Sequence, residues 1–235
     1  MFGDYKNFFG FVGARQGSKG LPGKNKLNIN GQPLFLIALN NLRAVGLTQI
    51  IFSSDCDDML QIARDHGYTT EKRPEKFSND SSRIPEEILR LSIEYNITCE
   101  YVLSVPPTAP LLRTQSLISA IKKVMASGNI DSCIAVNDWH SSYPGLAFYK
   151  DQNNQLTNIG NKLGIETYPR QDRIKLFENT GAFYIRNLKK MKAGKLDKST
   201  NWLGKKILFQ EITQQEAINI DIKADWERVK KYIKK

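Results

Sequence analysis

A glycine-rich, basic segment near the beginning of the chain, residues 10–25, constrains the possible folds more than any other stretch. The apolar residues at 8–12, which lead into it, predict a buried strand. The glycines at 13, 17, 20 and 23 then exclude a continuing strand or a stable helix, because glycine leaves the backbone too much conformational freedom for either. The strand must therefore end in a loop.

This loop carries three cations, Arg15, Lys19 and Lys24, among its glycines. Backbone N–H groups of such a loop can approach a polyanion while the cations neutralise its charge, which favours a triphosphate cradle over an ordinary solvated connection. The loop is not of the Walker A type, since Asn25 follows Gly-Lys where Ser or Thr is required. It is not a dinucleotide-binding loop either, since Arg15 stands in place of the first glycine.

The remaining chain alternates between strand and helix patterns. Apolar runs predict strands at 49–55, 101–105, 131–136, 177–185 and 205–211, and helical spacing predicts helices at 34–45, 57–66, 84–95 and 117–125. This alternation predicts an α/β fold with a mainly parallel sheet, and 235 residues are enough for a single domain over 1–235. Ligands bind such sheets beyond the carboxyl ends of the strands. Asp55 is thus expected on the same rim as the loop, with a helix N-cap as its alternative role.

One segment, residues 137–173, has little regular periodicity. An irregular insertion of this length is usually a functional segment or an interaction arm. Within it, we interpret His140 as a partly buried loop histidine rather than a catalytic base.

The composition limits the partners and the compartment. A formal net charge of +10 suits an anionic partner. The start of the chain lacks the pattern of a signal peptide, and no apolar run approaches the ~20 residues of a membrane span. Three scattered cysteines are typical of reduced thiols in a cytosol. We therefore expect a cytoplasmic protein that binds neither a membrane nor nucleic acid, since aromatic-basic stacking motifs are absent.

The loop sequence at 13–25, GARQGSKGLPGKN, closely resembles the signature loop of the CMP-N-acylneuraminate (CMP-sialic acid) synthetase family, which includes cytidylyltransferases of the CMP-legionaminic acid type. Further resembling segments are RPEKFSND at 73–80, PPTAPLLR at 106–113, PRQ at 169–171, NTGAFYI at 179–185 and INID at 218–221. The chain departs from the family at Pro106 (Gln in the family), at Leu146 (Lys) and at Asn219 (the first Asp of a carboxylate pair).

The resemblance implies a Rossmann-like, three-layer nucleotidyltransferase fold with a small excursion at about 137–173 that serves dimerisation and sugar-acid binding. It also implies transfer of CMP from CTP to the anomeric hydroxyl of a nine-carbon 2-keto sugar acid, with release of pyrophosphate. Sialic, legionaminic and pseudaminic acids all remain open as that substrate. The expected partners are CTP, the sugar acid and a second copy of the chain.

The resemblance also assigns residues. The nucleotide site it implies comprises Ala14, Arg15, Gly17, Ser18, Lys19, Lys24, Asn25, Arg73, Ser78, Asp80 and Thr108. The sugar-acid site it implies comprises Arg113, Arg170, Asn179, Thr180 and Gly181. Arg15, Lys19 and Asp221 are the expected catalytic residues. Asp221 is also the expected protein ligand of Mg²⁺ (or Mn²⁺), because such hard ions prefer carboxylate and phosphate oxygens.

Two other functions remain open at this stage. A glycosyltransferase of the GT-A type shares the nucleotide fold but needs an Asp-x-Asp triplet at the end of a strand. The triplet at 55–57 comes early in the chain, and the one at 219–221 has lost its first carboxylate. A non-enzymatic basic nucleotide-binding module would explain the charge but not the specific loop.

Overall fold

The computed structural model describes residues 5–17, 20–78, 82–138, 147–150, 152, 154–160, 164 and 175–233. The chain divides into two compact units. The main unit comprises residues 1–136 and 179–235, and the small unit comprises residues 137–178. The prediction of a single domain with an excursion at 137–173 stays a prediction, and much of that segment, including His140, Leu146 and Arg170, lies outside the described residues.

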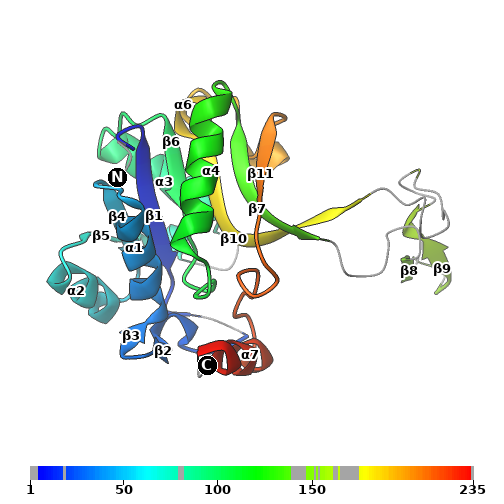
Figure 1. Cartoon of the computed structure of the whole chain (residues 1–235), viewed down its shortest axis with the longest axis horizontal. Coiled ribbons are helices and arrows are strands. Elements are labelled where there is room, and N and C mark those ends of the chain that lie inside the picture. Colours follow the sequence, from blue (N-terminus) through cyan, green and yellow to red (C-terminus); the bar gives the residue numbers. More distant parts are fainter. Residues whose placement is uncertain are drawn as a thin grey trace. The chain divides into compact units, whose positions relative to one another are not determined.

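A seven-stranded sheet forms the centre of the main unit, in the order β11-β7-β10-β6-β1-β4-β5 (Figure 1). The strands are β1 Phe8–Ala14, β4 Ile50–Ser54, β5 Thr69–Lys72, β6 Tyr101–Ser104, β7 Ser132–Asp138, β10 Phe177–Asn187 and β11 Ile207–Glu211. Strand β1 is parallel to β4 and β6, β4 is parallel to β5, and β7 is parallel to β11. Strand β10 runs antiparallel to β6. The predicted α/β fold with a mainly parallel sheet is therefore confirmed.

The helices are α1 Leu34–Val45, α2 Asp57–Asp65, α3 Ile84–Glu94, α4 Thr114–Ser127, α6 Leu188–Lys192 and α7 Lys223–Ile233. Short hairpins join β2 Asn28–Ile29 to β3 Gln32–Pro33, and β8 Phe148–Lys150 to β9 Leu156–Asn158 in the small unit. Among the described residues, none of the helices has the length and apolar character needed to cross a membrane.

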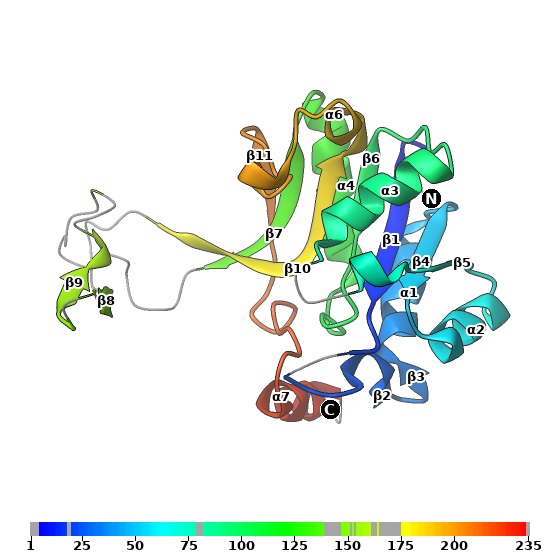
Figure 2. The same cartoon turned by 180° about the vertical axis from the view of Figure 1, so that it is seen from behind.

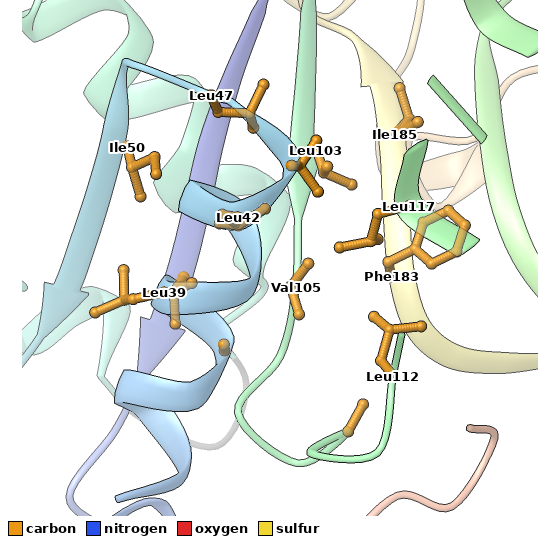
Figure 3. Close-up of a cluster of buried hydrophobic side chains, with 14 of the residues drawn as sticks. Leu39, Leu42, Leu47, Ile50, Leu103, Val105, Leu112, Leu117, Phe183 and Ile185 are labelled. Atoms are coloured by element: carbon orange, nitrogen blue, oxygen red, sulfur yellow. The ribbon is translucent and has the colours of Figure 1, made fainter. Parts of the chain in front are cut away.

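The layers follow from the alternation of side chains along each strand. Phe8 and Val12 of β1 pack into one apolar cluster with α1 and α4, whereas Phe9 and Phe11 pack into a second cluster with α3 and α6. Figure 3 shows part of the first cluster, and Figures 1 and 2 show the helices on the two faces of the sheet. Because both faces of the central strands are buried, these strands read as continuous apolar runs.

Strand β5 and helix α6 were not predicted from the sequence, and neither were the short hairpin strands β2, β3, β8 and β9. Strand β5 has the sequence Thr-Thr-Glu-Lys and carries no apolar run, because it is an edge strand with partly exposed side chains. Helix α6 has only five residues, too few to show a helical period. The helix expected at 117–125 begins earlier, at Thr114, and ends at Ser127.

A buried carboxylate, Glu216, connects the segment after β11 to the beginning of α4. The residue is 1% exposed, and its oxygens accept hydrogen bonds from the Arg113 guanidinium at 2.7 Å and the Thr213 hydroxyl at 2.9 Å. The Ser116 hydroxyl and the Arg113 backbone N–H donate to the same carboxylate. Burial alone would raise the pKa of Glu216, but the hydrogen bonds from Arg113, Ser116 and Thr213 outweigh it and lower the pKa to about 2.

We expect Glu216→Gln to lower the free energy of unfolding at pH 7 by about 1.5–3 kcal/mol, the range for hydrogen bonds to charged groups. A carboxyl with a depressed pKa stabilises the folded state above its unfolded pKa, and this contribution is lost as the pH falls toward 2. Urea unfolding at pH 7 and pH 3 should therefore show a smaller difference between the two proteins at pH 3. Glu75→Gln, at an exposed glutamate, is the control and should stay within about 0.5 kcal/mol of the parent. Equal differences at the two pH values would contradict this role of Glu216.

Candidate functional site

The carboxyl ends of β1, β4, β5 and β6 meet at one edge of the sheet, since these strands are parallel neighbours. The residues that follow them are the glycine loop, Asp55, Arg73 and the segment 106–108. The Gln16 backbone N–H donates to Asp55 Oδ1 at 2.7 Å, so the predicted proximity of Asp55 and the loop is confirmed. Asp55 is not the N-cap of α2, because Cys56 occupies that position.

The loop is held from inside by a buried amide. Asn25 is 7% exposed, and its Nδ2 donates to the Arg15 carbonyl at 2.8 Å. Arg15 Nη1 in turn donates to the Ser78 carbonyl at 3.3 Å. Gly20 packs against the segment before α7 so closely that a Cβ atom there would lie 2.4 Å from the Asp221 carbonyl oxygen. Only glycine fits this approach.

An ion pair joins the end of the loop to the other expected catalytic segment. Lys24 Nζ lies 2.9 Å from Asp221 Oδ1, and the Asp221 side chain is 74% exposed. Asp225, in the first turn of α7, accepts from the backbone N–H groups of Asp221 and Ile222 at 3.0 Å each. Asp221 and the loop are thus brought together, as expected. Ser18 and Lys19 lie outside the described residues.

A first cavity of about 320 Å³, here called the loop cavity, lies beside the loop. Its lining includes six of the residues expected to bind nucleotide, namely Arg15, Gly17, Lys24, Asn25, Arg73 and Thr108. Ala14 is buried in β1 and Ser78 supplies its carbonyl to Arg15, while Asp80 lies outside the described residues. The sequence analysis missed Phe77, Ser82, Arg83, Ile84 and Glu87, which also line this cavity.

Arg73 is a buried cation in the wall of the loop cavity. Its residue is 4% exposed, and its guanidinium donates to the Ser53 hydroxyl at 3.2 Å and to the Ser53 carbonyl at 3.3 Å. Burial lowers the pKa of Arg73, whereas the nearby carboxylate of Glu87 raises it and offsets part of this effect. Gly13 leaves the space for this side chain, since a Cβ there would lie 2.4 Å from Arg73 Nη2.

A second cavity of about 330 Å³, here called the strand cavity, lies over β1, β6 and β10. It is lined by Phe11, Gly13, Arg83, Ile84, Pro85, Ser104, Val105, Pro106, Gly181, Tyr184, Arg186 and Asn201. Gly13, Arg83, Ile84 and Pro106 line both cavities, so the two are neighbours.

The residues expected to bind the sugar acid are only partly brought together. Gly181 lines the strand cavity, and Asn179 Nδ2 donates to the Tyr184 hydroxyl at 3.2 Å. The Thr180 hydroxyl instead donates to the Ala135 carbonyl at 3.2 Å. Arg113 lines neither of these cavities and is paired with Glu216 at 2.7 Å. Arg170 lies outside the described residues.

Tyr184 and Arg186 were missed by the sequence analysis, although one signal was present. Arg186 follows the apolar run 182–185 of β10 at alternate spacing from Tyr184, and a charge in the buried part of a strand needs a compensating partner. The sequence does not show which face of the sheet these two side chains occupy, because that depends on pairing with β6, some 80 residues away.

Each carboxylate near the loop has a separate hydrogen-bond or ion-pair partner. Asp57 is paired with Lys72 at 2.6 Å, and Asp55 accepts from Gln16, so the triplet at 55–57 forms no paired metal site of the GT-A kind. Asn219 donates to the Thr180 carbonyl and accepts from the Thr108 hydroxyl at 3.3 Å. Within the described part of the chain, no group of three or more His, Cys, Asp or Glu side chains could hold a metal ion.

The three cysteines, Cys56, Cys99 and Cys133, are buried free thiols. Burial raises the pKa of Cys133 to about 12, which keeps its thiol protonated and unreactive at neutral pH. No cysteine lines the two cavities described above.

The sequence of this chain is similar to those of several cytidylyltransferases. It is 28% identical over 218 residues to the N-acylneuraminate cytidylyltransferase B of Danio rerio, covering 91% of this chain and 48% of the relative. It is 27% identical over 180 residues to the pseudaminic acid cytidylyltransferase of Campylobacter jejuni, covering 74% of this chain and 75% of the relative. The chain thus spans about half the length of the fish protein.

The fold is also that of a known nucleotidyltransferase. The solved structure of a CMP:2-keto-3-deoxy-manno-octonic acid synthetase in complex with CTP superposes with a TM-score of 0.71 at 13% identity, covering 97% of this chain and 98% of that one. At this identity the superposition establishes the fold alone. The family model described as cytidylyltransferase matches residues 9–187, which include the glycine loop, Arg73 and most of the strand cavity. The chain therefore belongs to the cytidylyltransferase family.

Proposed function

We propose that this protein transfers CMP from CTP to the anomeric hydroxyl of a nine-carbon 2-keto sugar acid and releases pyrophosphate. The observation that carries this proposal is the pair of neighbouring cavities at the carboxyl edge of the sheet, one lined by the glycine loop and both lined by cations. The relatives named for sialic and pseudaminic acid support an acid of this class as acceptor. A legionaminic acid is a third member of the same class.

The loop cavity is the proposed site of CTP. Arg15, Lys24 and Arg83 all line it, so the charge of a triphosphate is matched by guanidinium and ammonium groups. In the structure Lys24 forms an ion pair with Asp221, and a phosphate oxygen would compete with that carboxylate for the ammonium group. In this proposal Arg15 and Lys24 bind phosphate, and Arg73 lies near the pyrimidine.

The strand cavity is the proposed site of the sugar acid. An acceptor hydroxyl there could reach the α-phosphate in the neighbouring loop cavity, since Gly13 and Pro106 belong to both linings. In-line attack then displaces pyrophosphate, and this chain's cations neutralise the charge that shifts onto the leaving group. No covalent intermediate with the protein is needed.

Asp221 is the proposed protein ligand of Mg²⁺ or Mn²⁺. Magnesium sites often take one or two protein carboxylates and fill the remaining positions with phosphate oxygens and water, and an exposed carboxylate beside the loop fits that pattern. The bound ion would supply neutralisation of phosphate charge. Asn219 adds no second carboxylate, because its side chain is an amide, which bridges Thr108 and Thr180.

The first test concerns nucleotide choice. We expect CTP to raise the melting temperature of the protein more than UTP, ATP or GTP does, because the family model and the named relatives are cytidylyltransferases and the buried Arg73 lines the loop cavity where the base is proposed to lie. Thermal-shift profiles with each nucleotide at equal concentration measure this. Equal stabilisation by a purine triphosphate would contradict the assignment.

The second test separates cations from the metal ligand. We expect Arg15→Ala to lower both nucleotide affinity and kcat, and Asp221→Ala to lower activity in a way that excess Mg²⁺ partly restores. One preorganised contact of this kind is worth ~2.7–4 kcal/mol, or roughly a hundred- to thousandfold in rate. Pyrophosphate release from CTP across a panel of nine-carbon acids is the measurement.

The control for this second test is Asp58→Ala. Asp58 forms an exposed pair with Lys26 at the same distance of 2.9 Å but lines neither the loop cavity nor the strand cavity. Its activity should stay within about twofold of the parent, an effect below ~0.5 kcal/mol. If Arg15→Ala and Asp221→Ala also stayed within that range, the proposed transfer mechanism would be wrong.

We also propose a homodimer formed through the small unit. Its β8–β9 hairpin exposes large apolar side chains, with Phe148 at 55% and Leu156 at 74% exposure, and such residues often mark an interface. Light scattering should give twice the chain mass of 26.7 kDa, and Phe148→Lys with Leu156→Lys should reduce it to that of one chain. Ile93→Lys, at an exposed position of α3 in the main unit, is the control. A parent protein that is monomeric at micromolar concentration and fully active would overturn the dimer.

A further inference from the structure

Arg186 is a buried cation that follows the apolar run 182–185 of β10. The residue is 3% exposed and lies in β10 opposite Val102 of β6, with Tyr184 two residues earlier opposite Ser104. Its guanidinium carbon lies 4.3 Å from the centre of the Tyr184 ring. The flanking residues Phe183 and Ile185 point to the other face, where they join the first apolar cluster.

The hydrogen-bonding capacity of this guanidinium is largely unused. Arginine has five N–H donors. Nη1 donates to the Ser104 hydroxyl over a long distance of 3.4 Å, and Nε is buried without a hydrogen-bond partner. No carboxylate of the described residues forms an ion pair with Arg186, in contrast to Arg90, which pairs with Glu71 and Glu87. A buried charge of this kind is costly unless a partner compensates it.

Burial lowers the pKa of Arg186 to about 10. The side chain therefore remains a cation at neutral pH, and the cost of keeping it desolvated persists. An uncompensated buried charge that lines a cavity is better explained by a ligand that supplies the missing charge than by a structural role.

The strand cavity supplies the place for such a ligand. Arg186 and Arg83 are the charged residues among its lining, and Ser104, Tyr184 and Asn201 add hydroxyl and amide groups. No acidic side chain of the described residues lines it. Phe11, Ile84 and Val105 provide an apolar wall. This combination fits a ligand that carries one anionic group on an otherwise uncharged body.

We propose that Arg186 binds the carboxylate of the acceptor and thereby selects sugar acids over neutral sugars. This inference rests on the proposed function, which places the acceptor in the strand cavity. A guanidinium binds a carboxylate through two parallel N–H···O bonds, and such a fork gives direction as well as charge. A phosphate of the nucleotide is the less suitable anion, since Arg186 does not line the loop cavity where Arg15 and Lys24 lie.

The test compares an acid with its carboxamide. Calorimetry, with CTP present and divalent metal removed to prevent turnover, measures the affinity for N-acetylneuraminic, legionaminic and pseudaminic acid and for the carboxamide of each. We expect the parent protein to bind the preferred acid about tenfold to hundredfold more tightly than its carboxamide, the range for hydrogen bonds between charged groups. Arg186→Gln should lose that preference, with little change in affinity for the carboxamide. Arg186→Lys should restore part of it.

Arg43→Gln is the matched control. Arg43 also lies over a tyrosine ring, with its guanidinium carbon 3.8 Å from the centre of Tyr68, but it lines neither cavity. This variant should keep the parent's preference for the acid. A second readout is stability without ligand, since replacing an uncompensated buried charge should leave the melting temperature of Arg186→Gln unchanged or higher. A structural arginine would instead lose stability on replacement.

Several outcomes would overturn the inference. It is overturned if Arg186→Gln binds the acid within about twofold of the parent, if it loses affinity for acid and carboxamide equally, or if it loses CTP affinity instead. Binding of none of the three acids by the parent would also overturn it. The acid-over-carboxamide preference needs no variant, so a variant that fails to fold does not remove the test. Pyrophosphate release is measured separately: a parent that prefers the acid but releases no pyrophosphate contradicts the proposed function and leaves the role of Arg186 standing.

Discussion

The close contact between Arg73 and Gly13 is the constraint on which both cavities depend. The guanidinium occupies the space that any side chain at position 13 would fill, and Gly13 lines both the loop cavity and the strand cavity. Ser53 and Glu87 hold this arginine from β4 and α3. This buried polar network connects the end of β4 to α3, and through Arg73 it also packs against the end of β1. The loop that follows β1 therefore starts from a backbone position that is held in place.

The parts of the fold that sequence could predict are those decided by local patterns. The loop at 13–25 follows from glycines and cations within a few residues of each other, and Asp55 follows from the rule that parallel strands end on one edge. The edge strand β5 has no apolar period and could not be recognised. Arg113 shows that a matching local pattern does not place a side chain. Its segment fits the family pattern, but its partner, Glu216, lies 103 residues further along the chain and holds it away from both cavities.

Strand β10 explains why the second half of the candidate site was harder to predict than the first. It runs antiparallel to β6 and so brings residues 181–186 beside Ser104 and Phe11. The alternation along β10 shows that Tyr184 and Arg186 share a face. Only the register shows that this is the face of the sheet that carries Phe11 and an open cavity rather than the face packed by α4.

The two buried arginines of the described residues, Arg73 and Arg186, differ in how their charge is compensated, and this difference distinguishes a supporting role from a ligand-binding one. Arg73 is compensated from within the protein by Glu87 and by two contacts with Ser53, so its energetic cost is met before any ligand arrives. Arg186 has one long hydrogen bond and an aromatic ring. Since an apolar residue at position 186 would relieve the folded chain of a buried charge, the presence of arginine there is explained by an interaction that the protein alone does not contain. The folded chain is destabilised by this charge, and binding of an anion in the strand cavity would offset that cost.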